Sequence, residues 1–192
     1  QREDAEQQPL HPLRPAKPVG AATAGGQFTE TAASAGLDFI QREQPIDEAA
    51  VQRLLPVHHN GKGPAVAVGD LNGDGRDDMV IGGTVLDSTR IALQNSAGQY
   101  TPQSLGTARG LTNDGPVLLF AANGNGHDDI LVTHGGATLP EGSVEYQPQL
   151  YLNAGDGLAR APESALPPLH FSVGAAAAAD WDHNGTLDLF LG

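Results

Sequence analysis

Residues 70–78 read D-L-N-G-D-G-R-D-D and lie between two short apolar runs, A-V-A-V-G and M-V-I-G-G. Side chains that carry oxygen occupy alternate positions at Asp70, Asn72 and Asp74, and Asp78 closes the loop. Calcium takes roughly six to eight oxygen ligands, and a short loop supplies several of them from every second residue. The spacing therefore predicts a calcium-binding loop in preference to a plain acidic turn.

The residues around these ligands indicate which kind of calcium loop this is. Gly73 and Gly75 permit the positive-φ turns that let a short backbone wrap one ion. Arg76 is predicted to offer its carbonyl oxygen while its side chain points to solvent. An EF-hand would need flanking helices and a glutamate at position 12, where this chain has Ile81 between strand-like runs. The loop is therefore predicted to join two β-strands.

The motif occurs twice more, as A-A-N-G-N-G-H-D-D at 121–129 and D-W-D-H-N-G-T-L-D at 180–188. The three closing aspartates are roughly 50–60 residues apart, a period typical of β-propeller blades or another repeat array. The ligands predicted for the third loop, with Thr186 acting through its carbonyl, are Asp180, Asp182, Asn184, Thr186 and Asp188. The weaker candidates in the second loop, with His127 acting through its carbonyl, are Asn123, Asn125, His127 and Asp129. Because Ala121 replaces the first acid, the second loop is expected to bind calcium weakly or to be an empty turn.

These features resemble a known family. The run from a strand through D-x-N-x-D-G-x-x-D to a second strand ending in Gly-Gly is similar to the FG-GAP/VCBS repeat of integrin-α-type propellers. A-L-Q-N-S-A-G-Q-Y and L-Y-L-N-A-G-D-G-L resemble the outer hairpin of that family. The lead-in F-T-E-T-A-A-S-A-G-L-D-F, with G-P-A-V-A-V-G-D, resembles the bacterial branch associated with ASPIC/UnbV domains. The resemblance implies an all-β fold of four-stranded antiparallel blades whose hairpins carry calcium loops.

The chain is expected to have two parts. Residues 1–26, rich in Pro, Ala and Gly, are predicted to be a flexible segment, and residues 27–192 the propeller portion. A propeller closes with about four to eight blades, whereas the third blade here is truncated. The chain is therefore predicted to be a partial propeller, with the remaining blades in a longer polypeptide.

Short strands are predicted for most of the propeller portion. Before the first loop, we expect a strand at 28–31, a strand or turn at 36–40 and a short helix at 47–55. The blade strands are predicted at 65–68, 79–81, 90–94, 99–102, 117–121, 130–133, 149–152, 158–160 and 171–179. The last range holds five consecutive alanines, which favour helix by propensity, but the same place in the other repeats reads as a strand.

Composition excludes several classes of protein. The formal net charge of −13 argues against nucleic-acid binding, and no apolar run approaches the roughly 18 residues of a membrane span. The chain has no cysteine and therefore no disulfide or thiolate metal site. Calcium loops of modest charge suit millimolar calcium, so we expect a secreted, periplasmic or cell-surface protein.

The histidines and the tryptophan outside the ligand positions receive simpler interpretations. His58 and His59 are predicted to be solvated loop residues in preference to a transition-metal site. His134 and His183 are not expected to be catalytic bases, because no nucleophile motif accompanies them. Trp181 is predicted to cover a blade junction in preference to binding sugar. Three further acids are interpreted as solvated turn residues: Asp77, Asp128 and Asp156.

Two function classes remain open. The first is a non-catalytic, calcium-stabilised extracellular adhesion or binding module whose loop face meets a protein or a glycan. The second is the propeller scaffold of a secreted carbohydrate-active enzyme, or of another hydrolase or lyase. No paired carboxylates, nucleophile elbow or cofactor motif supports the second class. A histidine with two acids on one face, outside the calcium loops, would favour it.

Overall fold

The computed structural model describes residues 28–45, 47, 50, 53–54, 63–106 and 110–192. The chain divides into two units, Gln1–Thr31 and Ala32–Gly192. The strand predicted at 28–31 is wrong: these residues are exposed and adopt a bend and irregular backbone. The predicted flexible segment 1–26 and the two histidines His58 and His59 lie outside the described residues. Most of the predicted helix 47–55 also lies outside the described residues. Within it, the Ala50 amide donates to the Asp47 carbonyl at 3.1 Å.

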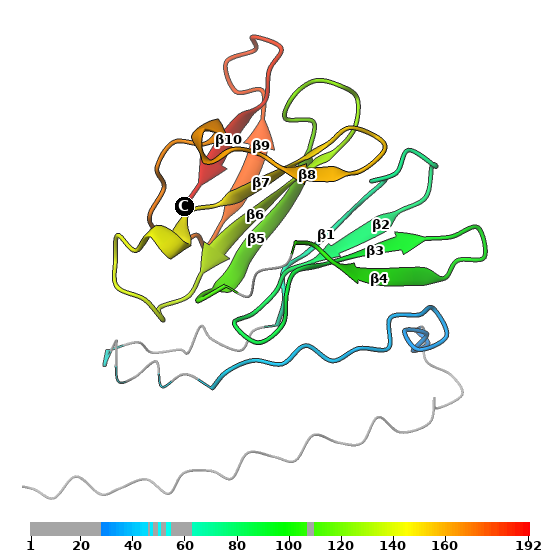
Figure 1. Ribbon diagram of the computed structural model, residues 1–192, viewed down its shortest axis with the longest axis horizontal. Coiled ribbons are helices and arrows are strands. Elements are labelled where there is room, and N and C mark those ends of the chain that lie inside the picture. Colours follow the sequence, from blue (N-terminus) through cyan, green and yellow to red (C-terminus); the bar gives the residue numbers. More distant parts are fainter. Residues whose placement is uncertain (1–27, 46, 48–49, 51–52, 55–62, 107–109) are drawn as a thin grey trace, which may run out of the picture. The chain divides into compact units, whose positions relative to one another are not determined.

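Two complete four-stranded antiparallel sheets form in the second unit (Figure 1). The first sheet runs in the order β1 (Val66–Gly69), β2 (Asp78–Ile81), β3 (Arg90–Gln94) and β4 (Tyr100–Ser104). The second runs in the order β5 (Asn113–Phe120), β6 (Asp129–Gly135), β7 (Gln149–Asn153) and β8 (Leu158–Arg160). Each predicted blade strand has a counterpart, but β5 begins four residues earlier than expected, and the strand predicted at 171–179 is confirmed only over its last four residues.

The third sheet of the second unit is a two-stranded hairpin of β9 (Ala176–Ala179) and β10 (Asp188–Leu191). The alanines form a strand because each pairs with a residue of β10, from Ala176 with Leu191 to Ala179 with Asp188. Two single-turn 3₁₀ helices, η1 (Val144–Tyr146) and η2 (Glu163–Ala165), flank β7 and β8. No helix among the described residues is long and apolar enough to cross a membrane.

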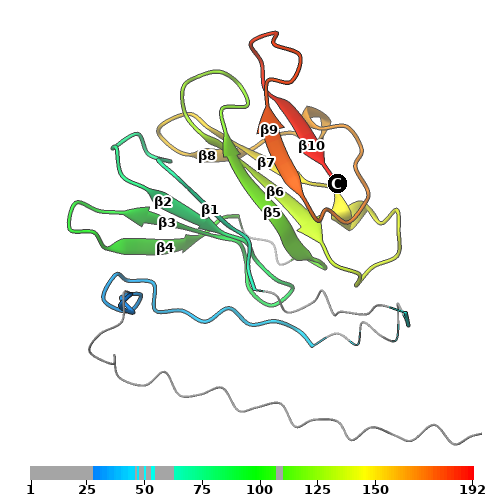
Figure 2. The ribbon, with the colours of Figure 1, turned by 180° about the vertical axis from the view of Figure 1, so that it is seen from behind.

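The sheets stack face to face as propeller blades do. The innermost strands lie in sequence, with β5 in contact with both β1 and β9, and the two ribbon views agree on this order (Figures 1 and 2). One apolar core lies between the first two blades. Its buried members come from both of them: Leu71, Val80, Ile91, Leu105, Val117, Ile130, Val132 and Tyr151. The architecture is therefore all-β, with consecutive propeller blades.

Hydrogen bonds fasten the junction of the first two blades at both ends. At the end with the 70–78 loop, the buried Asn153 donates from Nδ2 to the Leu71 carbonyl at 2.7 Å. At the opposite end, Asp114 Oδ2 accepts from the Gly83 amide at 2.5 Å and from the Thr89 hydroxyl at 2.6 Å. Buried polar groups with satisfied partners fix one packing arrangement, so the junction is specified by more than apolar contact.

A segment before the first blade is tied to the same end as Asp114. Arg42 binds the Asp87 carboxylate through its guanidinium at 2.7 Å and through its amide at 2.6 Å. Hydrogen bonds from the Arg42 side chain and amide lower the pKa of Asp87 to about 2. The Arg90 guanidinium carbon also lies 4.5 Å from the centre of the Phe39 ring. The charge of Asp87 is therefore already compensated.

The third hairpin exposes residues whose counterparts are buried in the complete blades. Phe190 is 64% exposed, whereas the matching Val80 and Leu131 are fully buried. The described chain leaves the Trp181 side chain 86% exposed, so its role in covering a blade junction stays a prediction. The matching residue of the first loop, Leu71, is buried because the second blade packs over it. No described blade covers Trp181 in the same way.

Candidate metal centre

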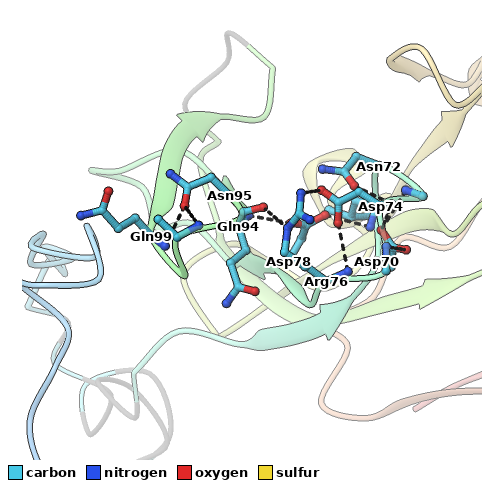
Figure 3. Close-up of polar contacts among 12 residues, drawn as sticks. Asp70, Asn72, Asp74, Arg76, Asp78, Gln94, Asn95 and Gln99 are labelled. Carbon is cyan, nitrogen blue, oxygen red and sulfur yellow. Dashed lines mark hydrogen bonds and ion pairs between the residues drawn. The ribbon is translucent and has the colours of Figure 1, made fainter.

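Each of the three loops contains the same ladder of side chain to backbone hydrogen bonds. In the first loop, Asn72 Oδ1 accepts from the Asp74 amide at 3.0 Å, and Asp74 Oδ1 accepts from the Arg76 amide at 2.9 Å (Figure 3). The ladder draws the side-chain oxygens to one side of the turn, because each bonds an amide two residues ahead.

The other two loops repeat this geometry at matching positions. In the third loop, the amides of Asn184 and Thr186 donate to Asp182 and Asn184 at 3.1 and 2.8 Å. In the second loop, the amides of Asn125 and His127 donate to Asn123 and Asn125 at 3.0 and 2.9 Å. The second loop therefore keeps the turn although it lacks the first acid.

The first acid of the motif gathers several amides at once. Asp70 accepts from the amides of Gly73, Asp74 and Gly75 at 2.8, 3.1 and 2.7 Å. These bonds, the one from Gly75 above all, lower the pKa of Asp70 and keep its carboxylate ionised. Asp180 accepts in the same way from the amides of Asn184 and Gly185, each at 3.0 Å.

Two of the closing aspartates, Asp78 and Asp129, have a structural role that the sequence pattern does not reveal. Asp129 is fully buried and accepts from the Ala122 amide at 2.8 Å and from the Asn153 amide at 2.7 Å. Asp78 does the same with Leu71 and Gln94, at 3.0 and 2.7 Å. Each therefore ties its loop to the third strand of its own blade. The available signal was an acid at the head of an apolar strand, where burial demands partners.

The third loop brings three carboxylates together. Asp180, Asp182 and Asp188 each offer a carboxylate oxygen, and these oxygens lie within 4.8 Å of one another. Asp188 accepts from the Trp181 amide at 3.0 Å but, unlike its counterparts, is exposed. Converging anions in an all-oxygen donor set fit a hard cation such as calcium. Among the predicted ligand sets in the described chain, this is the set whose carboxylate oxygens lie close enough together to share one ion.

Arg76 changes the electrostatics of the first loop. Its guanidinium bonds the Asp74 carboxylate and also the Gln94 carbonyl, at 3.1 Å from Nε (Figure 3). The prediction that this side chain points to solvent is wrong, because an ion pair and a carbonyl acceptor lie within its reach. The cationic side chain therefore competes for Asp74 with any ion in the first loop.

Neighbouring residues serve the shape of the loops. His183 is exposed and occupies the loop position that Gly73 and Gly124 hold in the other two loops. Its φ of 59° is the one positive φ at a non-glycine residue within the described ranges. The His127 ring packs against Gly155: a Cβ added at Gly155 would lie only 2.7 Å from His127 Nε2. Of the three acids predicted to be solvated, Asp77 and Asp156 are exposed, whereas Asp128 is half-buried against the first blade.

Comparison with known families agrees with this geometry. Residues 63–90 match the FG-GAP repeat, and residues 122–191 match the FG-GAP-like repeat. No curated protein matches the chain. The chain therefore contains FG-GAP repeats, and the matched segments include the first loop, most of the second and the whole of the third.

The preserved ladder of the second loop leads to a prediction about Ala121. The variant Ala121→Asp should bind calcium at this loop at least about tenfold more tightly than the wild type, because it adds an anion to a turn already shaped for one. Calcium titration calorimetry of both proteins measures the change. Ala97→Asp, which adds an acid to an exposed outer turn, is the matched control. Equal affinities for Ala121→Asp and the wild type would contradict the carboxylate-count argument.

Proposed function

We propose that this protein is a non-catalytic, calcium-stabilised extracellular binding module that recognises a protein or a glycan. The observation that carries the proposal is the convergence of Asp180, Asp182 and Asp188 in a loop whose backbone is already folded. Negative charges on three carboxylates this close repel one another, and a cation among them would offset that repulsion. A bound cation would therefore stabilise the hairpin.

Calcium would be held by the first and third loops. The residues that would hold it are Asp70, Asn72, Asp74, Asp78, Asp180, Asp182, Asn184 and Asp188, with the carbonyls of Arg76 and Thr186. When bound, the ion supplies positive charge that offsets carboxylate repulsion and rigidifies the hairpins. We expect the third loop to bind calcium more tightly than the first loop, because in the first loop Arg76 already pairs with Asp74.

The partner and the location follow from the same features. The three loops join the first two strands of successive blades, so they share one end of the stack (Figure 1). Together they would form the surface that meets the partner. Calcium loops of this charge suit the calcium concentration outside cells. We place the protein in the periplasm, at the cell surface or in the secreted fraction, in the bacterial ASPIC/UnbV-associated group. The remaining blades of a longer polypeptide would cover Trp181 and Phe190.

Binding assays with and without calcium test this function. We expect immobilised glycans or matrix proteins to retain the protein in millimolar calcium and to release it in excess EGTA, because loss of the ion removes the stabilisation of the loops. Asp182→Asn should weaken retention even in calcium. Asp156→Asn, which neutralises an exposed acid outside the loops, should not. Retention indifferent to both EGTA and Asp182→Asn would overturn the proposed role of calcium.

A further inference from the structure

A cleft of about 280 Å³ lies between the first two blades, far from the calcium loops. Thr89 and Leu105 of the first blade and Asp114, His134, Gln149 and Tyr151 of the second are among its lining residues. His134 lies on β6 five residues after Asp129, which closes the second loop. Five residues of strand span about 17 Å, so the cleft is at the opposite end of the blade.

A histidine and an acid meet in this cleft. The His134 side chain is only 8% exposed, and its Nδ1 lies 3.3 Å from Asp114 Oδ1. Within the described chain Nδ1 has no hydrogen bond of normal geometry, although buried polar atoms are generally paired. Asp114 cannot turn to improve the contact, because its other oxygen holds the Gly83 amide and the Thr89 hydroxyl. Nδ1 is thus closed to solvent, so a ligand in the cleft would meet the ring through its remaining edge, which includes Nε2.

The second blade supplies further polar groups. The Tyr151 hydroxyl donates to Gln149 Oε1 at 2.9 Å, which leaves the Gln149 amide NH₂ and a lone pair of the hydroxyl for another partner. Burial raises the pKa of Tyr151, so the hydroxyl stays protonated. The apolar side chains of Leu105 and Val132 lie among these groups. The lining thus combines donors and acceptors with apolar patches.

The charges of the cleft favour a neutral ligand. Asp87 is paired with Arg42, and Asp114 faces His134. Arg160 at the rim lies 4.0 Å from Glu163. Each charged lining residue in the described part of the chain therefore already has a hydrogen-bond or ion-pair partner, Asp114 through the Gly83 amide and the Thr89 hydroxyl. A hydroxyl can donate and accept at once, and it can satisfy an imidazole nitrogen or an amide without adding charge.

We propose that this cleft binds a single uncharged sugar residue, such as the terminal unit of a glycan. Its volume is near the lower limit for ligand pockets, roughly 300 Å³, and suits one ring. Neighbouring hydroxyls would bond His134, Asp114 and Gln149, while the C–H face of the ring packs on Leu105 and Val132. The inference rests on the glycan option of the proposed function, but its site shares no residue with the calcium loops.

Titration of the full chain with methyl glycosides tests the proposal. The probes are the methyl glycosides of glucose, galactose, mannose, N-acetylglucosamine, fucose and rhamnose, followed through the imidazole ¹⁵N signals of His134. At least one glycoside should shift these signals saturably at millimolar concentration. His134→Gln should weaken that binding at least about tenfold, and Tyr151→Phe, which removes one hydroxyl, at least about threefold. The matched control His170→Gln should leave the affinity unchanged.

Each contrary result has a definite meaning. If no glycoside shifts the His134 signals, or if Tyr151→Phe and His134→Gln both bind as the wild type does, the cleft is not a sugar site. Tyr151→Phe keeps the test decisive if His134→Gln fails to fold, as melting curves will show. Sugar binding that persists in EGTA below the melting temperature supports this inference even where the calcium proposal fails. Calcium-dependent glycan retention with no effect at His134 overturns this inference alone.

Discussion

Asp129→Asn is expected to lower the free energy of unfolding by about 3 kcal/mol, because each hydrogen bond to a buried charge contributes roughly 1.5–3 kcal/mol. The carboxylate is fully buried and holds the amides of Ala122 and Asn153. Asparagine keeps one acceptor oxygen but turns an NH₂ group towards an N–H donor, which leaves buried polar groups unsatisfied. Urea unfolding of the variant and the wild type measures the difference.

The second loop is the right place for this test, because it is the loop expected to bind calcium most weakly. The destabilisation should therefore be the same in calcium and in EGTA. Asp128→Asn, one residue away and half-buried, is the matched control and should cost less than about 1 kcal/mol. A loss that appears only when calcium is present would show that Asp129 acts as an ion ligand and not as a structural acceptor.

Removing calcium with EGTA is expected to lower the melting temperature by roughly 5–10 °C. An ion present at a hundred times its dissociation constant adds about 2.7 kcal/mol to the folded state, and each kcal/mol corresponds to about 2–4 °C in a chain of this size. Differential scanning calorimetry in calcium and in EGTA measures the shift. Asp182→Ala should reproduce most of it, and Asp74→Ala less, because Arg76 already neutralises part of the first loop.

Asp156→Ala serves as the control for charge alone, since this acid is exposed and lies outside the ligand positions. It should leave both melting curves unchanged. A melting temperature that EGTA does not alter would refute a stabilising ion. If EGTA instead abolished a turnover activity without any effect on melting, the metal would be catalytic and the proposed function would be wrong.

Much of the fold was predictable from local patterns. The alternating oxygens of residues 70–78, their flanking apolar runs and their recurrence at 121–129 and 180–188 located the hairpins, and the structure confirms strands on either side of each. The polyalanine strand β9 was predicted from its place in the repeat against its own propensity. Such features depend on residues near in sequence, so a single chain displays them.

The remaining features depend on contacts between distant residues. Arg76 bonds a carbonyl 18 residues away, and Asn153 bonds Leu71 across 82 residues. His134 was set aside for want of a nucleophile motif, yet the pairing of β5 with β6 places Asp114 opposite it. Trp181 was predicted to cover a blade junction, but no described residue packs over its side chain in the way the second blade packs over Leu71. Partners of this kind are fixed by strand pairing within a blade and by stacking between blades, which no local pattern encodes.

The bonds at both ends of the first blade junction affect how the molecule opens. Repeat arrays held by nearest-neighbour contacts alone unfold piecemeal, one repeat after another. Here Asn153 and Asp114 clamp the two blades above and below their shared core. Strands β2 and β6, at the centre of that core, should therefore exchange their amide hydrogens together, as one cooperative unit. The β9–β10 hairpin, which lacks both clamps in the described chain, is free to exchange on its own faster timescale.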